Sequence, residues 1–222
     1  MPVVFLAAGP RSVLLYHQAY EEEGLGCPDV DERVEPTKLL YPRSFVEGVN
    51  ALPDDKRFDY SFMGALYRPE VFPHRAWVLD FARRRFTDRS HLVLSESPPE
   101  HRRLGSFDHT TEAQGVWVPK EVPWGERDYF NPVFFQVLRQ SQFALCPAGD
   151  LPWSQRFFEA VMCRSIPIVS DPEHAGRHDH ERAIGYRMYL ADDEHVYDED
   201  IVEENYELFL RHQTLTGAQH SA

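Results

Sequence analysis

Residues 143–171 read FALCPAGDLPWSQRFFEAVMCRSIPIVSD. An apolar run, Phe143–Cys146, predicts a short strand, and it ends in a glycine-containing turn, Pro147–Asp150. The pattern then favours a helix over Ser154–Cys163 and a second strand over Ile166–Val169. A strand, a helix and a strand in this order are typical of a parallel α/β sheet.

The start of the predicted helix suits a phosphate group. Ser154 is a good N-cap residue, and the first backbone N–H groups of a helix have no partner within the helix. Arg156 and Glu159 follow three residues apart, near the same end. A guanidinium suits a diphosphate, and a carboxylate suits the paired hydroxyls of a ribose. An ordinary capped helix with an Arg–Glu pair is the alternative interpretation of these residues.

The same alternation extends along the chain. Further strands are expected at Val3–Ala8, Phe58–Met63 and His91–Leu94, a second apolar segment at Ser12–Tyr16, and helices at His74–Phe86, Asn131–Gln140 and Glu194–Gln213. Ala51–Lys56 is interpreted as a linker or turn, and Pro167 indicates the edge or the start of its strand. Ligands of such sheets bind beyond the carboxyl ends of the strands. Two loops are therefore expected to face a ligand, Gly64–Arg68 and Cys146–Arg156.

These ordered elements resemble the signature of the exostosin-like glycosyltransferases. Its Cys-Pro-x-Gly-Asp turn, its Ser-x-Arg-hydrophobic-hydrophobic-Glu-Ala helix and its Ile-Pro-Val-Ile strand stand here as Leu145–Asp150, Ser154–Ala160 and Ile166–Val169. The upstream segment Phe62–Arg68, FMGALYR, looks like the Phe-x-Gly…Arg element of that family. The family usually has a glycine in the turn before Ile-Pro-Val, whereas this chain has Cys163-Arg164-Ser165.

The resemblance covers about residues 58–171 with gaps, and it implies an α/β fold of GT-B type with a Rossmann-like parallel sheet. It implies a metal-independent transferase without a cofactor, which moves a sugar from a nucleotide-sugar donor to a glycan or other hydroxyl acceptor. The donor site that it implies consists of Gly64, Arg68, Gly149, Asp150, Ser154, Arg156 and Glu159, with Gly149 and Asp150 near the sugar. Ser154 and the amides after it would hold the diphosphate, Arg68 and Arg156 would neutralise it, and Glu159 would meet the ribose.

Three segments are expected along the chain. Residues 1–55 are interpreted as a short or truncated, acceptor-side subdomain, residues 56–215 as the nucleotide-sugar-binding domain, and residues 216–222 as a frayed tail. His17 is a candidate base for the acceptor hydroxyl by its position alone, and an ordinary surface histidine is the alternative. The short first segment keeps open a second function. The chain would then be a non-catalytic nucleotide-sugar or glycan-binding module that needs a partner transferase chain, and a homo-oligomer is the other assembly considered.

Composition limits the classes of partner. The 222 residues carry a formal net charge of -13, which weighs against binding to a nucleic-acid backbone or an anionic membrane. The cations are three lysines and twenty arginines, and arginine suits phosphate and carboxylate. Three cysteines without paired spacing favour free thiols in a reducing compartment. With no apolar run long enough for a membrane span, the expected location is cytoplasmic.

A local group of histidine and aspartate residues supports a third hypothesis, a metal-dependent hydrolase. Imidazoles and carboxylates at this spacing are among the ligands that bind divalent metals. The sequence shows no helix or hairpin that would hold them in place, so a solvated loop is the simpler interpretation. The group consists of Asp171, His174, His178, Asp179 and His180.

Overall fold

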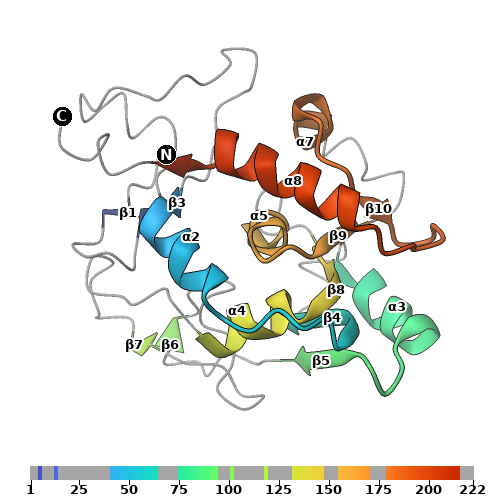
Figure 1. The fold of residues 1–222 in the computed structure, drawn as a ribbon. Helices are drawn as coiled ribbons and strands as arrows, with labels where there is room; N and C mark the ends of the chain where they lie inside the picture. Colours follow the sequence, from blue (N-terminus) through green and yellow to red (C-terminus); the bar gives the residue numbers. More distant parts are fainter. Residues whose placement is uncertain are drawn as a thin grey trace.

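The computed structural model describes residues 5–6, 13–14, 41–64, 75–94, 101–102, 118–119, 132–147, 155–170 and 179–215. Within these residues a five-stranded, all-parallel sheet has the order β10-β9-β8-β4-β5 (Figure 1). Its strands are β4 (Phe58–Gly64), β5 (His91–Leu94), β8 (Ser141–Leu145), β9 (Ile166–Val169) and β10 (Tyr189–Leu190). The predicted α/β class with a Rossmann-like parallel sheet is therefore confirmed.

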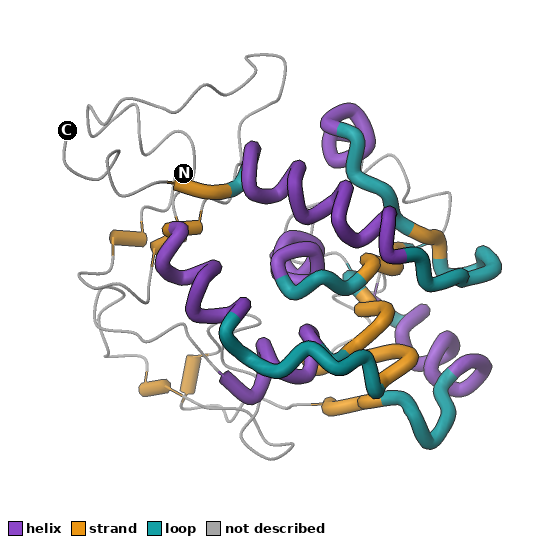
Figure 2. Tube along the Cα trace, in the orientation of Figure 1, coloured by secondary structure: helices purple, strands orange, loops and turns teal. Residues whose placement is uncertain are grey.

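Helices cover both faces of this sheet, as Figure 2 shows. One face packs against α3 (Trp77–Arg85), and the other against α4 (Pro132–Arg139) and α5 (Gln155–Met162). Outside α5 lie α2 (Arg43–Asn50) and α8 (Glu199–His212), and α7 (Asp179–Ile184) precedes β10. None of the helices that the structure describes is both long enough and apolar enough to span a bilayer.

Short strands pair outside the main sheet. Two antiparallel pairs are β1 (Phe5–Leu6) with β2 (Val13–Leu14), and β6 (His101–Arg102) with β7 (Val118–Pro119). A parallel pair joins β3 (Tyr41–Pro42) to β11 (Thr214–Leu215), so the segment before α2 meets the segment after α8.

Alternate residues of the strands divide between two hydrophobic clusters. Phe62 and Phe143 point into the cluster under α3, together with Val78 and Phe81 of that helix. Met63 and Ala144 point to the opposite side, where α2, α4, α5 and α8 pack. This period of two is the one expected for strands that are covered on both faces.

Pro167 lies inside the sheet and not at its edge, because β9 has β8 on one side and β10 on the other. The main-chain oxygen of Ile168 accepts from the N–H of Cys146 after β8, whereas the oxygen of Val169 accepts from Ala191 after β10. Residues 167 and 169 therefore both face β10. Pairing with β10 begins only at Ile168, so the missing N–H of Pro167 costs no ladder bond.

Two helix predictions change in the structure. The helix expected over 194–213 begins at Glu199, because Asp198 has an extended backbone and its side chain accepts a hydrogen bond from the N–H of Asp200. Helix α2 is not among the helices that the sequence predicts, and it begins directly after Pro42. Proline just before a helix is compatible with its start.

The first residues described after position 40 share the core of the sheet. Tyr41, Phe45, Val46 and Val49 belong to the same hydrophobic cluster as residues of α4, α5 and α8. The expected boundary after residue 55 stays a prediction, but α2 on its amino-terminal side is packed against the domain that follows.

Candidate functional site

The order of the strands reverses between β4 and β8. From β4 the chain goes to β5 at one edge, and from β8 it goes through β9 to β10 at the other edge. The loop after β4 leads to α3 on one face, and the loop after β8 leads to α5 on the opposite face. Loops that diverge in this way leave a crevice beyond the carboxyl ends of the strands, where ligands of open α/β sheets bind.

The two loops predicted to face a ligand follow these two neighbouring strands, β4 and β8. Gly64 ends β4, Cys146 and Pro147 follow β8, and Arg156 is the second residue of α5. The sheet thus brings together two segments that lie about eighty residues apart in sequence. The rest of both loops lies outside the described residues.

Arg156 joins the first turn of α5 to the end of β4. One of its terminal nitrogens donates a hydrogen bond to the main-chain oxygen of Met63. Its guanidinium carbon lies 4.8 Å from the centre of the Phe62 ring, within cation–π distance. Arg156 is only 7% exposed. The structure therefore holds one positive charge at the carboxyl end of β4, beside the point where the strand order reverses.

Glu159 lies one turn further along α5 and is completely buried. Its Oε1 accepts a hydrogen bond from Nε2 of Gln155 at 3.0 Å. A buried carboxylate is costly unless it has hydrogen bonds and a nearby cation, and such groups gather at functional sites. Arg156 lowers and Glu159 raises the pKa of the Cys146 thiol, so both charges lie near the end of β8.

The two described cysteines are free and buried. Burial raises the pKa of the Cys146 thiol far above its usual value, and the neighbouring Arg156 guanidinium offsets only part of this rise. Burial likewise raises the pKa of Cys163. Both thiols stay protonated at neutral pH, which makes them core residues and not nucleophiles. This agrees with the expectation of free thiols for these two, whereas Cys27 lies outside the described residues.

The turn that departs from the resembled family has a left-handed residue. Arg164 has a φ of 58°, and the N–H of Ser165 bonds to the oxygen of Ala160, which closes a Schellman-type helix end. Glycine adopts this conformation without steric cost. Here the arginine adopts it, and its guanidinium stacks on Tyr206 at 4.2 Å and pairs with Glu203 at 3.4 Å.

Several predicted site residues cannot be placed. Arg68, Gly149, Asp150, Ser154 and the candidate base His17 lie outside the described residues, and their roles stay predictions. The same holds for the side chains of the Asp171–His180 group. Among the residues that the structure does describe, no three His, Cys, Asp or Glu side chains come together as a metal site would require.

Two residues beside the predicted site have no role assigned from the sequence, where they appear only within the quoted motifs. Phe62 provides the ring against which Arg156 lies, and Gln155 donates to Glu159. A signal for Phe62 was present, because residues two apart in a strand share a face and Phe62 and Gly64 belong to the same short element. Gln155 had no comparable signal beyond its i, i+4 spacing from Glu159.

Comparisons with known proteins find similar sequences. A family profile described as the exostosin GT47 domain matches residues 66–209, which include α5. The chain is similar to the probable glucuronosyltransferase GUT1 of Oryza sativa subsp. japonica, with 28% identity over 96 residues, 36% of this chain and 23% of that protein. It is also similar to the probable glucuronosyltransferases Os01g0926700 and Os01g0926600 of the same organism. Each is 42% identical over 38 residues, 17% of this chain and 9% of the relative. The chain thus matches less than a quarter of the length of these relatives.

Proposed function

This chain belongs to the exostosin GT47 family of glycosyltransferases, and on that premise we propose that it transfers a sugar from a nucleoside-diphosphate donor to a hydroxyl group of a glycan or another acceptor. The observation that carries the proposal is the position of Arg156. Its guanidinium is held at the carboxyl end of β4, beside the reversal of strand order, on the first turn of α5. A fixed cation at that place suits a diphosphate.

The proposed chemistry follows from charge. When the bond between sugar and diphosphate breaks, negative charge grows on the leaving diphosphate, and a preorganised cation and helix amides stabilise it. Arg156 supplies the cation, and Glu159 meets the hydroxyls of the ribose. Because an arginine fills the charge-neutralising role, we propose that the transfer needs no metal cofactor. The relatives named as probable glucuronosyltransferases make a nucleotide-activated glucuronic acid the first donor to test.

The first experiment measures binding of UDP and GDP by calorimetry, with and without EDTA. We expect binding that EDTA leaves unchanged and that Arg156→Ala weakens at least tenfold. Arg156→Lys keeps the charge without the planar fork and should give an intermediate affinity. Arg83→Ala is the matched control, because Arg83 is an exposed arginine paired with Asp80 on α3. Absence of nucleotide binding at millimolar concentration would contradict the proposal.

Turnover separates the transferase from the second candidate function. A chain that binds UDP and also transfers sugar from a nucleotide-sugar to an oligosaccharide acceptor is the proposed enzyme. A chain that binds the nucleotide tightly without turnover acts as a binding module for a partner transferase. The small part of each relative that this chain matches is the observation that favours testing this alternative.

A further inference from the structure

Gly64 lies directly against the guanidinium of Arg156. A Cβ atom added at Gly64 would lie 3.0 Å from Nη2 and 3.2 Å from Nη1 of Arg156, and 3.0 Å from Cζ of Phe62. These separations are shorter than the van der Waals contact of about 3.5–4.0 Å between carbon atoms. The absence of a side chain at position 64 is therefore what leaves room for the guanidinium.

The Phe62 ring and the main chain of Met63 also contact the Arg156 guanidinium. Phe62 is two residues before Gly64, so its ring lies on the same face of β4, and it is only 1% exposed. The guanidinium carbon lies 4.8 Å from the ring centre, and Nη2 donates to the oxygen of Met63. Three consecutive residues of one strand thus fix a group that belongs to a helix 92 residues later in the chain.

We propose that Gly64 and Phe62 are positioning residues for Arg156 and that neither binds the donor itself, an inference that rests on the proposed function. The ring and the missing side chain hold the guanidinium in one orientation at the carboxyl ends of β4 and β8. An arginine side chain that is fixed in advance loses less conformational entropy when it binds a diphosphate. This role differs from the direct donor contact that the sequence resemblance implied for Gly64.

The contact between Gly64 and Arg156 predicts that substitutions at positions 64 and 62 change the orientation of the guanidinium and not the fold. In Gly64→Ala the new Cβ meets the far end of the Arg156 side chain and the edge of the Phe62 ring, and both are side-chain atoms, which move more easily than a backbone. The fold should persist, while the guanidinium is displaced and its bond to Met63 is lost. In Phe62→Leu the position stays apolar, but the ring face that holds the cation is removed.

The test is a double-mutant cycle on the full chain, with the Kd for UDP as the readout. Gly64→Ala and Arg156→Ala should each raise the Kd at least tenfold, and the double variant should not exceed Arg156→Ala by more than about twofold. Gly48→Ala, the same change in α2, is the matched control and should leave the Kd unchanged. Additive effects in the cycle would overturn the proposal, because Gly64 would then act without Arg156.

A second readout distinguishes positioning from general loosening of the structure. Displacement of a phosphate-binding group weakens UDP but not uridine, so the ratio of the two affinities should fall about tenfold in Gly64→Ala. Phe62→Leu should lower the same ratio severalfold. Phe81→Leu is its control, because Phe81 is a buried ring on the same sheet face that comes from α3 and packs against Tyr60. Equal weakening of UDP and uridine in Gly64→Ala would overturn the proposal.

The double-mutant cycle can also be measured without a ligand. Failure of the proposed function is then distinguished from failure of the positioning role. If the wild-type chain binds no nucleoside diphosphate, the proposed function fails, and the midpoint of urea unfolding replaces the Kd. Gly64→Ala should then lower the midpoint in the wild-type background and lower it less in the Arg156→Ala background, where the close contacts with the guanidinium are gone and only the one with the Phe62 ring stays. An equal decrease in both backgrounds would overturn the positioning role.

Discussion

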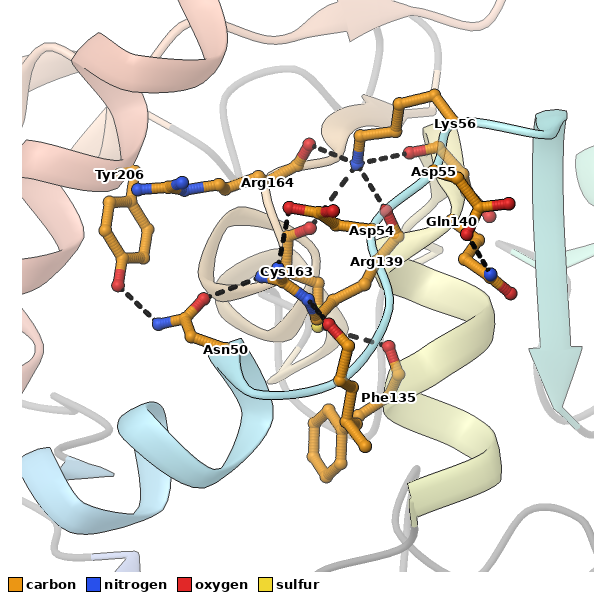
Figure 3. A network of polar contacts seen from close by, with 12 residues as sticks. Asn50, Asp54, Asp55, Lys56, Phe135, Arg139, Gln140, Cys163, Arg164 and Tyr206 are labelled. Carbon is orange, nitrogen blue, oxygen red and sulfur yellow. Dashed lines mark hydrogen bonds and ion pairs between the residues drawn. The ribbon is translucent and has the colours of Figure 1, made fainter.

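The ammonium group of Lys56 lies 2.6 Å from the main-chain oxygen of Arg139, the last residue of α4 (Figure 3). The same nitrogen lies 2.7 Å from the oxygen of Arg164 and 3.0 Å from that of Ser141. Burial lowers the pKa of Lys56 to about 8, so the group is still mostly charged at pH 7. One lysine thus binds the ends of α4 and α5, where carbonyl groups lack partners within the helix and favour a cation.

Replacement of Lys56 by methionine keeps the aliphatic stem and removes the donors. We expect Lys56→Met to lower the free energy of unfolding by about 2–4 kcal/mol, because hydrogen bonds from a charged group contribute about 1.5–3 kcal/mol each and are not additive. Urea denaturation at pH 7 measures the difference. Arg57→Met, a neighbouring and exposed position, is the control and should change the stability by less than about 1 kcal/mol. Equal effects would contradict a special role for Lys56.

The left-handed turn at Arg164 allows a comparison of two substitutions. Arg164→Ala and Arg164→Gly both remove the stacking on Tyr206 and the pair with Glu203. Only glycine relieves the steric cost of a φ of 58°, which is about 1 kcal/mol for an alanine. We therefore expect Arg164→Gly to be more stable than Arg164→Ala by about 1 kcal/mol in urea unfolding. If the alanine variant is as stable as the glycine variant, position 164 carries no backbone strain.

The sequence predicts most of the sheet and part of the site. The strands at 91–94 and 166–169 have their predicted bounds, because apolar runs bounded by polar residues are a strong local signal. Local chemistry at a helix start singles out Arg156 and Glu159, and their role in a donor site stays a prediction. The sequence does not predict the residues around Arg156. They are set by the pairing of β4 with β8, which joins positions more than eighty residues apart.

The contacts of Lys56 are another feature that the sequence does not predict. The segment Ala51–Lys56 has no periodicity and was interpreted as a linker or turn, and the structure does find a loop there. Its role comes from four carbonyl groups that α4, β8 and the end of α5 bring to one place. No local pattern indicates such a convergence, because it arises only after the helices pack.

Glu159→Gln tests the proposed ribose contact. The amide has almost the shape of the carboxylate, and its oxygen can still accept the hydrogen bond from Gln155. The fold should therefore persist, while the Kd for UDP rises about tenfold, because the hydroxyls of a ribose bind a charged acceptor more strongly. Glu203→Gln on α8, an exposed position, is the control. A UDP affinity equal to that of the wild type would exclude the carboxylate from the nucleotide site.

Phe45→Ala tests whether α2 belongs to the sheet domain. Phe45 is 3% exposed, and its ring meets that of Phe135 in α4 edge to face at 5.5 Å. Loss of a buried ring costs about 3–5 kcal/mol. The whole sheet domain should lose this stability in one cooperative urea transition. Val133→Ala on the exposed start of α4 should cost less than about 0.5 kcal/mol. An independent subdomain over 1–55 predicts an unchanged transition of the sheet domain instead.

His195 makes the stability depend on pH. Its Nε2 lies 2.9 Å from the main-chain oxygen of Leu190, which can only accept, so Nε2 carries the proton and Nδ1 accepts from Tyr60 at 3.4 Å. The rings of Phe81, Phe143 and Tyr189 lie 5.5–5.7 Å from the imidazole. Burial lowers the pKa of His195 below its usual 6.5, and the Arg85 charge lowers it further. The hydrogen bond to the Leu190 oxygen and the charges of Asp192 and Asp193 raise this pKa and offset part of the decrease.

The unfolded chain therefore binds more protons at this position than the folded chain between the lowered pKa and 6.5. The stability that the neutral imidazole contributes is complete above about pH 6.5 and is lost as the pH falls through the lowered pKa. We expect the difference in unfolding free energy between the wild type and His195→Gln to be largest at pH 7–8 and to shrink towards pH 5. Taking this difference cancels the titration of all other groups. A difference that stays constant from pH 8 to pH 5 would show that the imidazole titrates alike in both states, in spite of its burial among the aromatic rings.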